Sequence, residues 1–136
     1  MGDIFEKIIT REIPASIIYE DDVVIAFLDI KPINKGHALI VPKKKFRNIF
    51  DGDSEVLGHM MQVAQKVAIA LQKVTGAKGI NVAMNNEDAA GQDVFHAHLH
   101  VIPRFKRGEA FQPAQHVTYE DGEMDTLAET IKASFT

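Results

Sequence analysis

The chain has 136 residues, no cysteine and a formal net charge of −4. This length suits one domain that buries its own core, and the lack of cysteine excludes disulfides and thiolate metal sites. A net negative charge disfavours a general nucleic-acid binder, which needs a broad basic face. No stretch approaches the roughly 18 apolar residues of a membrane span. We therefore expect a cytoplasmic protein without nucleic-acid or membrane partners.

The first part of the chain predicts a short helix and a meander of three strands. Asp3 can cap a helix whose apolar residues recur at helical spacing, and Pro14 would end it. The acidic turn after Tyr19 separates two strands of a hairpin, and Pro42 closes a third strand. Short links between the strands imply antiparallel pairing. The predicted elements are residues 4–9, 17–19, 23–28 and 37–42.

The longest periodic segment, Glu55 to Thr75, predicts a helix that Gly76 stops. Its apolar residues form two adjoining stripes, which are too wide for the sheet alone to cover. We therefore expect the helix to contact a second copy of the chain. The later predicted elements are a strand at 79–84, a loop at 85–92, a strand at 93–104 and a helix at 122–135.

These elements predict an α+β fold with about five antiparallel strands, one long helix and one short N-terminal helix. We expect a single domain over residues 1–136, with a core at about 3–107 and a C-terminal extension at 108–136. The sequence contains no internal repeat or low-complexity segment that would suggest a second domain.

Three histidines stand at every second position of one segment: His96, His98 and His100. In a strand they would share one face, while the apolar residues between them would face the core. A row of imidazoles can bind a metal, act as nucleophile and acid/base, or form a polar solvent face. Strict alternation disfavours the last of these.

The motif His-Ala-His-Leu-His-Val-Ile resembles the signature of the histidine triad (HIT) superfamily, and in particular bacterial Hit and HINT-like nucleotide hydrolases. The similarity extends in order along nearly the whole chain. The matching segments are Ile4 to Ile9, Glu12 to Pro14, Tyr19 to Asp22, Phe27 to Ile30, Gly36-His37, Val41 to Lys43, Asn85 and Ala90 to Gln92.

The resemblance implies a nucleotide hydrolase or transferase that attacks the α-phosphate of nucleoside 5′-monophosphate derivatives through a nucleotidyl-histidine intermediate. The substrates would be purine phosphoramidates or dinucleoside polyphosphates, without a cofactor. His98 would be the nucleophile. His96 and His100 would orient and polarise the reacting groups. His37 and His100 would lie close to the phosphate. The resemblance also implies a homodimer that joins two five-stranded sheets into one.

The nucleotide-binding residues implied by the resemblance fall into three groups. Asp29 would accept hydrogen bonds from the ribose hydroxyls. The walls of the base pocket would be Phe5, Ile8, Phe27 and Ile30. The phosphate and leaving-group side would be formed by the loop residues Asn85, Gly91, Gln92, Asp93 and Val94.

The chain departs from the family pattern at two places. Some bacterial relatives hold a structural zinc through two cysteines, a later histidine and the first triad histidine; Asp3, Glu6 and Lys45 stand at the first three positions, so we predict no metal. Asp93 stands where serine or threonine is usual, and its charge could repel phosphate. Two alternatives stay open, namely a nucleotide-binding interaction protein with weak catalysis and a histidine-ligated metalloprotein.

Overall fold

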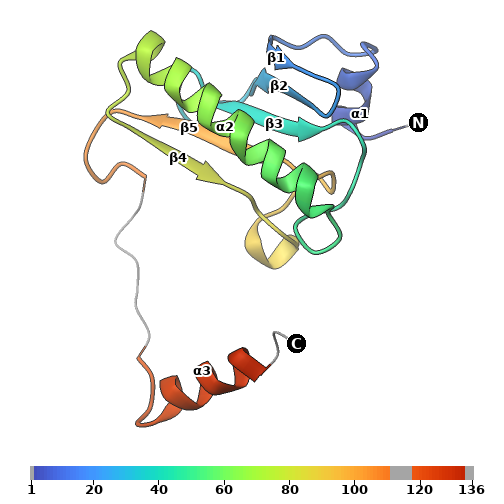
Figure 1. Ribbon diagram of the computed structural model, residues 1–136. Helices are drawn as coiled ribbons and strands as arrows, with labels where there is room; N and C mark the ends of the chain where they lie inside the picture. The colour runs from blue at the N-terminus through green and yellow to red at the C-terminus, as the bar shows by residue number, and fades with distance from the viewer. Residues whose placement is uncertain (1, 111–117, 134–136) are drawn as a thin grey trace.

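Five antiparallel strands form one sheet in the order β1-β2-β3-β5-β4, which confirms the expected α+β fold (Figure 1). The computed structural model describes residues 2–110 and 118–133. The elements are α1 (Ile4–Ile9), β1 (Ile17–Glu20), β2 (Val24–Leu28), β3 (Ala38–Pro42), α2 (Ser54–Thr75), β4 (Gly79–Ala83), the 3₁₀ turn η1 (Asp88–Ala90), β5 (Leu99–Arg104) and α3 (Glu123–Ala133).

The sheet separates two apolar cores because successive side chains of a strand point to opposite faces. On one face α2 packs over alternate residues of β2, β3 and β5. On the other face α1 packs over the residues between them. The first core includes Met60, Val63, Val67, Ile40 and Val101; the second includes Phe5, Ile8, Phe27, Leu39 and Val41.

Helix α2 begins and ends as its sequence predicts. The Asp53 side chain accepts hydrogen bonds from the first turn, and Gly76 ends the helix in the left-handed conformation, with φ of 72°. Of the two predicted stripes, one side is buried against the sheet, whereas Met61 and Val74 are exposed. Met61 borders the groove beside β4 where we expect the second copy, whereas Val74 lines a separate recess.

Helix α1 has the bounds that we predicted, residues 4–9. Asp3 forms the expected cap, as a capping box in which Glu6 reaches back to the Asp3 amide. The helix ends at Ile9, and the chain turns at Arg11, whose φ is 68°, before it reaches Pro14. This cap places Phe5 and Ile8 on the sheet.

Strand β5 is shorter than the segment 93–104 that we predicted. It begins at Leu99, so His96 and His98 precede the strand. Its pairing with β3 begins at Leu99, which lies opposite Ile40, although β3 itself runs on to Pro42. Before the strand, the Ala97 amide donates to the Phe46 carbonyl at 2.8 Å.

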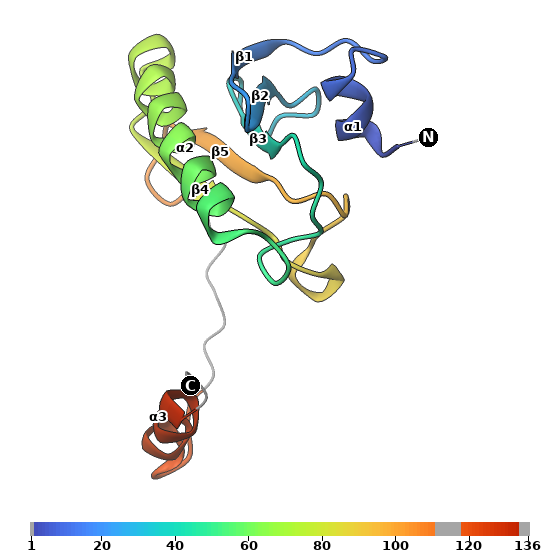
Figure 2. The same ribbon diagram turned by 45° about the vertical axis from the view of Figure 1, so that its right-hand side comes forward.

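Helix α3 stands apart from the sheet and α2 (Figure 2). Met124 and Leu127 on this helix are exposed. The end of the predicted helix at Phe135 lies outside the described residues. Within the residues that the structure describes, no helix is both long enough and apolar enough to cross a membrane.

Candidate active site

His96 is fully buried, and both of its ring nitrogens contact oxygen atoms. Nδ1 lies 3.1 Å from Asp3 Oδ2 at the start of α1, and Nε2 lies 2.8 Å from the carbonyl oxygen of Pro42 at the end of β3. The edge of the Phe5 ring also meets the His96 ring. His96 therefore joins α1 to the sheet and has no nitrogen free for a ligand.

His98 has one ring nitrogen engaged and one available. Its Nδ1 lies 2.8 Å from the backbone carbonyl of His96, and because a carbonyl only accepts, Nδ1 carries the proton and donates. In the neutral ring, Nε2 then keeps its lone pair. Phe5 packs against the ring at a centroid distance of 4.9 Å, and the His100 ring lies 5.0 Å from it.

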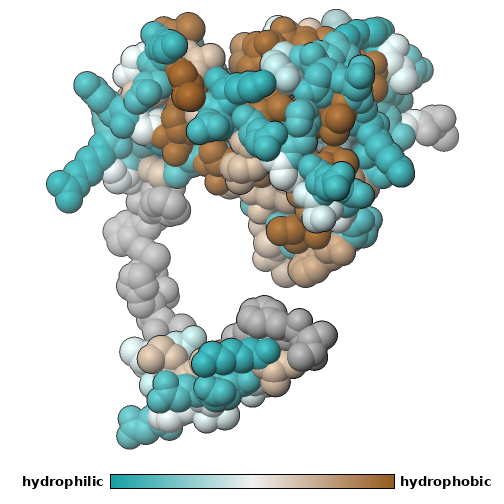
Figure 3. Space-filling view, viewed as in Figure 1, coloured by the Kyte–Doolittle hydropathy of each residue, from teal (hydrophilic) through white to brown (hydrophobic). Residues whose placement is uncertain are grey.

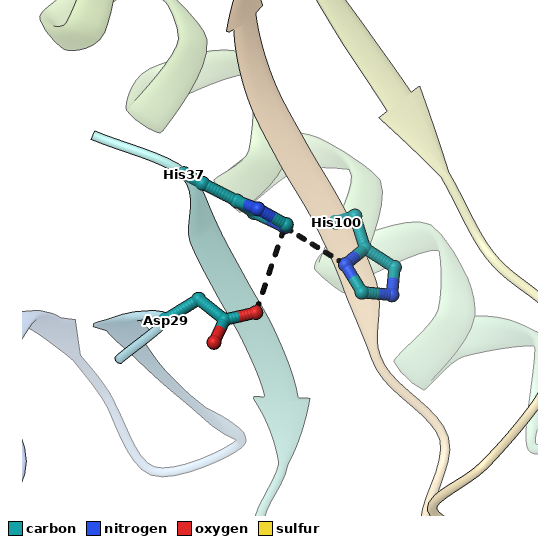
Figure 4. A group of neighbouring side chains, drawn as sticks. All are labelled: Asp29, His37 and His100. Atoms are coloured by element: carbon teal, nitrogen blue, oxygen red, sulfur yellow. Dashed lines mark hydrogen bonds and ion pairs between the residues drawn. The ribbon is translucent and has the colours of Figure 1, made fainter. Parts of the chain in front are cut away.

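A chain of hydrogen bonds sets the tautomers of His37 and His100 (Figure 4). The Ile33 amide donates to His37 Nδ1 at 3.1 Å, so the ring proton of His37 is on Nε2. That Nε2 lies 2.9 Å from His100 Nδ1 and 3.8 Å from Asp29 Oδ2. His100 Nδ1 accepts, which leaves the proton of His100 on its Nε2.

Burial keeps His37, His98 and His100 largely neutral. It lowers the pKa of His100 to about 4, helped by the neighbouring His98 and His37 and opposed by Asp29 and Asp93. It also lowers the pKa of His98, against the hydrogen bond to the His96 backbone and the charge of Asp93. The pKa of His37 falls for the same reason, although Asp29 opposes the shift. A neutral imidazole at neutral pH is a usable nucleophile.

The residues expected around a nucleoside differ in exposure. Asp29 follows β2, with Oδ1 accepting from the Lys31 amide at 2.9 Å and Oδ2 facing His37. Phe5, Ile8 and Phe27 are buried together in the core beneath α1, where Phe5 also touches His98. Ile30, which follows Phe27 closely in the sequence, is instead 84 % exposed. The histidines and Asp29 thus lie at the edge of an apolar cluster.

The loop before the triad is held by a buried amide network that sequence reasoning missed. Gln92 is 2 % exposed; its oxygen accepts from Asn48 and from the Glu87 amide, and its nitrogen donates to the Arg47 and Val94 carbonyls. Its amide is therefore engaged within the protein. Asn48, which also binds Glu87, carried no signal in the sequence beyond its being a polar residue in a turn.

The other loop residues expected near phosphate lie around this network. Gly91 adopts a φ of 91°, and a Cβ there would approach the Asn85 side chain at 3.7 Å. Val94 packs on the core beneath α1. Asp93 is exposed, and its charge reaches His98 and His100. The structure thus brings Asp93 near the histidines and Asn85 near Gly91.

The donor set around His96 does not fit a zinc ion. The Lys45 ammonium lies 3.1 Å from Asp3 Oδ2 and 3.4 Å from Glu6 Oε1, so a side-chain cation already occupies the space between the two carboxylates. Elsewhere, Asp29, His37 and His100 offer ligand atoms within 4.8 Å of one another. There, however, the hydrogen bond between the two rings already uses the His100 Nδ1 lone pair.

Comparison with known proteins gives one consistent family. The model of the HIT domain matches residues 10–107. Protein hit of Bacillus subtilis is 41 % identical over 108 residues, which cover 79 % of this chain and 74 % of that protein. A structure of a HIT family protein from Bacillus anthracis superposes with a TM-score of 0.88 at 38 % identity and covers 100 % of both chains.

A plant relative has a named activity. The adenylylsulfatase HINT3 of Arabidopsis thaliana is 38 % identical over 104 residues, which are 76 % of this chain and 53 % of that protein. The chain therefore spans about half the length of this relative.

Proposed function

The chain belongs to the HIT family, and on that premise we propose that it is a nucleotide hydrolase or transferase that works through a nucleotidyl-histidine intermediate on His98. The substrates are 5′-monophosphate derivatives of purine nucleosides, either phosphoramidates or dinucleoside polyphosphates. The adenylylsulfatase activity named for the plant relative supports attack at an adenylyl phosphate. A location in the cytoplasm is part of this proposal.

One observation supports the choice of nucleophile most directly. Among the three triad histidines, His98 alone has a ring nitrogen with a lone pair and no partner in the described structure. Both nitrogens of His96 contact oxygens, and His100 Nδ1 accepts from His37 while its Nε2 holds the proton. The donor on His98 Nδ1 leaves Nε2 as the attacking atom.

The reaction then has two balanced steps. His98 Nε2 forms a bond to the α-phosphorus as the bond to the leaving group breaks, and a neighbouring imidazole supplies the proton that an amine or phosphate leaving group needs. Water next attacks the same phosphorus, the phosphorus–nitrogen bond breaks, and the proton of water returns to the imidazole. The negative phosphate of a bound substrate would favour a second proton on His100, which then donates from Nε2 to the leaving group and takes up the proton of water in the second step.

Asp29 supports the nucleoside part of the proposal. Its carboxylate lies 3.8 Å from His37 and follows Phe27 of the apolar cluster beneath α1 by two residues, so a ribose bound there would connect a base to a phosphate at the histidines. A carboxylate can accept both ribose hydroxyls. A steady-state comparison of an adenosine phosphoramidate with diadenosine polyphosphates would identify the preferred leaving group, and absence of turnover with either class would contradict the enzyme assignment.

The Asp29, His37 and His100 cluster is the observation that favours a metalloprotein as the second candidate. Metal analysis of protein purified without a tag separates the two functions, because the proposed chemistry needs no divalent ion. We expect nucleotide binding to persist in a chelator. A stoichiometric metal, with binding lost on chelation, would favour the second candidate. A single-turnover assay distinguishes the enzyme from a nucleotide-binding protein with weak catalysis.

We also propose a homodimer built on α2 and β4. Strand β4 is an edge of the sheet and has unpaired backbone groups on its outer side. Beside it runs an apolar groove between α2 and β4, and apolar residues gather on the exposed surface over α2 (Figure 3). The groove is lined by Gly58, Met61, Gln62, Ala64, Gln65, Ala68 and Val82, none of which is charged. Pairing β4 with its copy would extend the sheet across the dimer.

A further inference from the structure

The surroundings of His96 determine how many protons its ring carries. A neutral imidazole offers one N–H donor and one lone-pair acceptor, whereas the protonated ring offers two donors. Asp3 Oδ2 at 3.1 Å and the Pro42 carbonyl at 2.8 Å are both acceptors. A neutral ring would therefore set a nitrogen lone pair against an oxygen lone pair inside a fully buried site.

Asp3 has the charge that a second ring proton requires. Burial raises its pKa, but hydrogen bonds from the Glu6 amide and Lys45, together with His96, more than offset this and leave the pKa below its usual value. The same oxygen, Oδ2, meets Lys45 on the outside and His96 on the inside. One ionised carboxylate thus bridges a surface ammonium and a buried ring.

We propose that Asp3 is a positioning residue that holds His96 as a buried imidazolium, a fixed positive charge next to the nucleophile. The arrangement uses a carboxylate and a lysine where the donor set does not fit a zinc ion. Because His98 donates its Nδ1 proton to the backbone of His96, the charge lies beside His98. Its effect on catalysis rests on the proposed function; the protonation of His96 does not.

The charge has a direct consequence for His98. A neighbouring cation disfavours a second proton on the His98 ring and so preserves the Nε2 lone pair. The other charges that act on His98, those of Asp93 and Asp29, have the opposite effect. His96 is thus the neighbour that opposes two carboxylates, and Asp3 secures its charge.

Nitrogen NMR of the histidine rings in the full-length protein tests this without any assay. At neutral pH we expect both ring nitrogens of His96 to resonate in the protonated range, while His37, His98 and His100 each show one protonated and one unprotonated nitrogen. An unprotonated nitrogen on His96 in the parent protein overturns the proposal. The role of His98 would then still stand, since deletion of His98 tests it separately.

Two matched variants extend the test. Asp3→Asn keeps an N-cap of equal quality but removes the charge, so one His96 nitrogen should move to the unprotonated range. Glu6→Gln removes the other carboxylate of the cluster, which meets Lys45 but not His96, and should leave the His96 signals unchanged. Unchanged signals in Asp3→Asn, or equal changes in both variants, would refute the role of Asp3.

Kinetics give a second readout that a purely structural role would not move. In Asp3→Asn we expect kcat to fall roughly tenfold, with KM within about twofold of the parent, and the acidic limb of kcat/KM to move to higher pH. The direction follows because loss of the cation makes His98 easier to protonate. A fall in kcat with an unshifted acidic limb would contradict the electrostatic effect.

Discussion

At the scale of single residues, the four histidines have different roles because their hydrogen-bond partners differ. The alternation of His96, His98 and His100 in the sequence predicted that they would lie together, and their shared contacts with Phe5 and with one another agree with this. The alternation could not predict which one is free to react. That depends on Ile33, Pro42 and the His96 carbonyl, which act through the backbone and leave no trace in side-chain patterns.

Asp29 should matter for the nucleoside and not for phosphate. Asp29→Ala removes a charge-assisted pair of hydrogen bonds to the ribose, which should weaken binding of adenosine monophosphate by roughly 1.5 to 3 kcal/mol. Titration calorimetry with the monophosphate and with inorganic phosphate measures both effects. An unchanged affinity for the monophosphate would remove Asp29 from the binding site.

His100 should make the fold sensitive to acid. Its pKa of about 4 in the folded protein lies below the value of about 6.5 in the unfolded chain, so between these values the unfolded state binds more protons. The stability contributed by neutral His100 is complete above pH 6.5 and is lost as pH falls toward 4. The loss amounts to about 2 to 3 kcal/mol, allowing for partial exposure.

Urea unfolding of the parent and of His100→Asn at pH 7.5 and pH 4.5 checks this. Both proteins lose stability on acidification as other groups titrate, but the variant should lose less, by about the amount assigned to His100. Equal losses in the two proteins would show that the pKa of His100 is not depressed.

At the scale of elements, the sequence predicted most of the fold, and the errors are at the ends. Asp53 and Gly76 define α2 because caps are local signals. The predicted start of β5 was wrong, because the strand begins only at Leu99, where its pairing with Ile40 of β3 begins. That pairing partner is remote in sequence from the segment that it limits. Gln92 illustrates the same limit, since two of its four hydrogen bonds reach Asn48 and Arg47, which are 44 and 45 residues away in the sequence.

The exposed side of α2 carries the prediction for assembly. Met61 is 52 % exposed in the groove beside β4, and Met61→Glu would place a carboxylate from each copy in an apolar interface, at a cost of roughly 3 kcal/mol or more. We expect the parent to be a dimer in solution scattering at micromolar concentration and this variant to be a monomer.

Val74→Glu is the matched control. Val74 is 83 % exposed and lies at the end of α2 in a separate apolar recess with Ile18 and Leu28. A carboxylate there should leave the dimer intact. A monomeric parent, or dissociation by Val74→Glu and not by Met61→Glu, would contradict the proposed interface.

At the scale of the whole molecule, the two faces of the sheet carry different parts of the protein. The face under α2 holds the larger core and, by our proposal, the dimer; the face under α1 holds the histidines and Asp29. Because the histidines lie on the face away from α2, a change in the groove beside β4 should not displace them directly.

The role of His98 as nucleophile can be tested by rapid quench with a substrate labelled at the α-phosphate, followed by mass spectrometry of the peptide that holds residues 94–104. We predict a nucleotidyl adduct on His98 during turnover, and a fall in turnover of several orders of magnitude in His98→Ala with nucleotide binding retained. His96→Ala and His100→Ala should lose about 10²- to 10⁴-fold. An adduct on His96 or His100, or near-parental turnover by His98→Ala, would contradict the account.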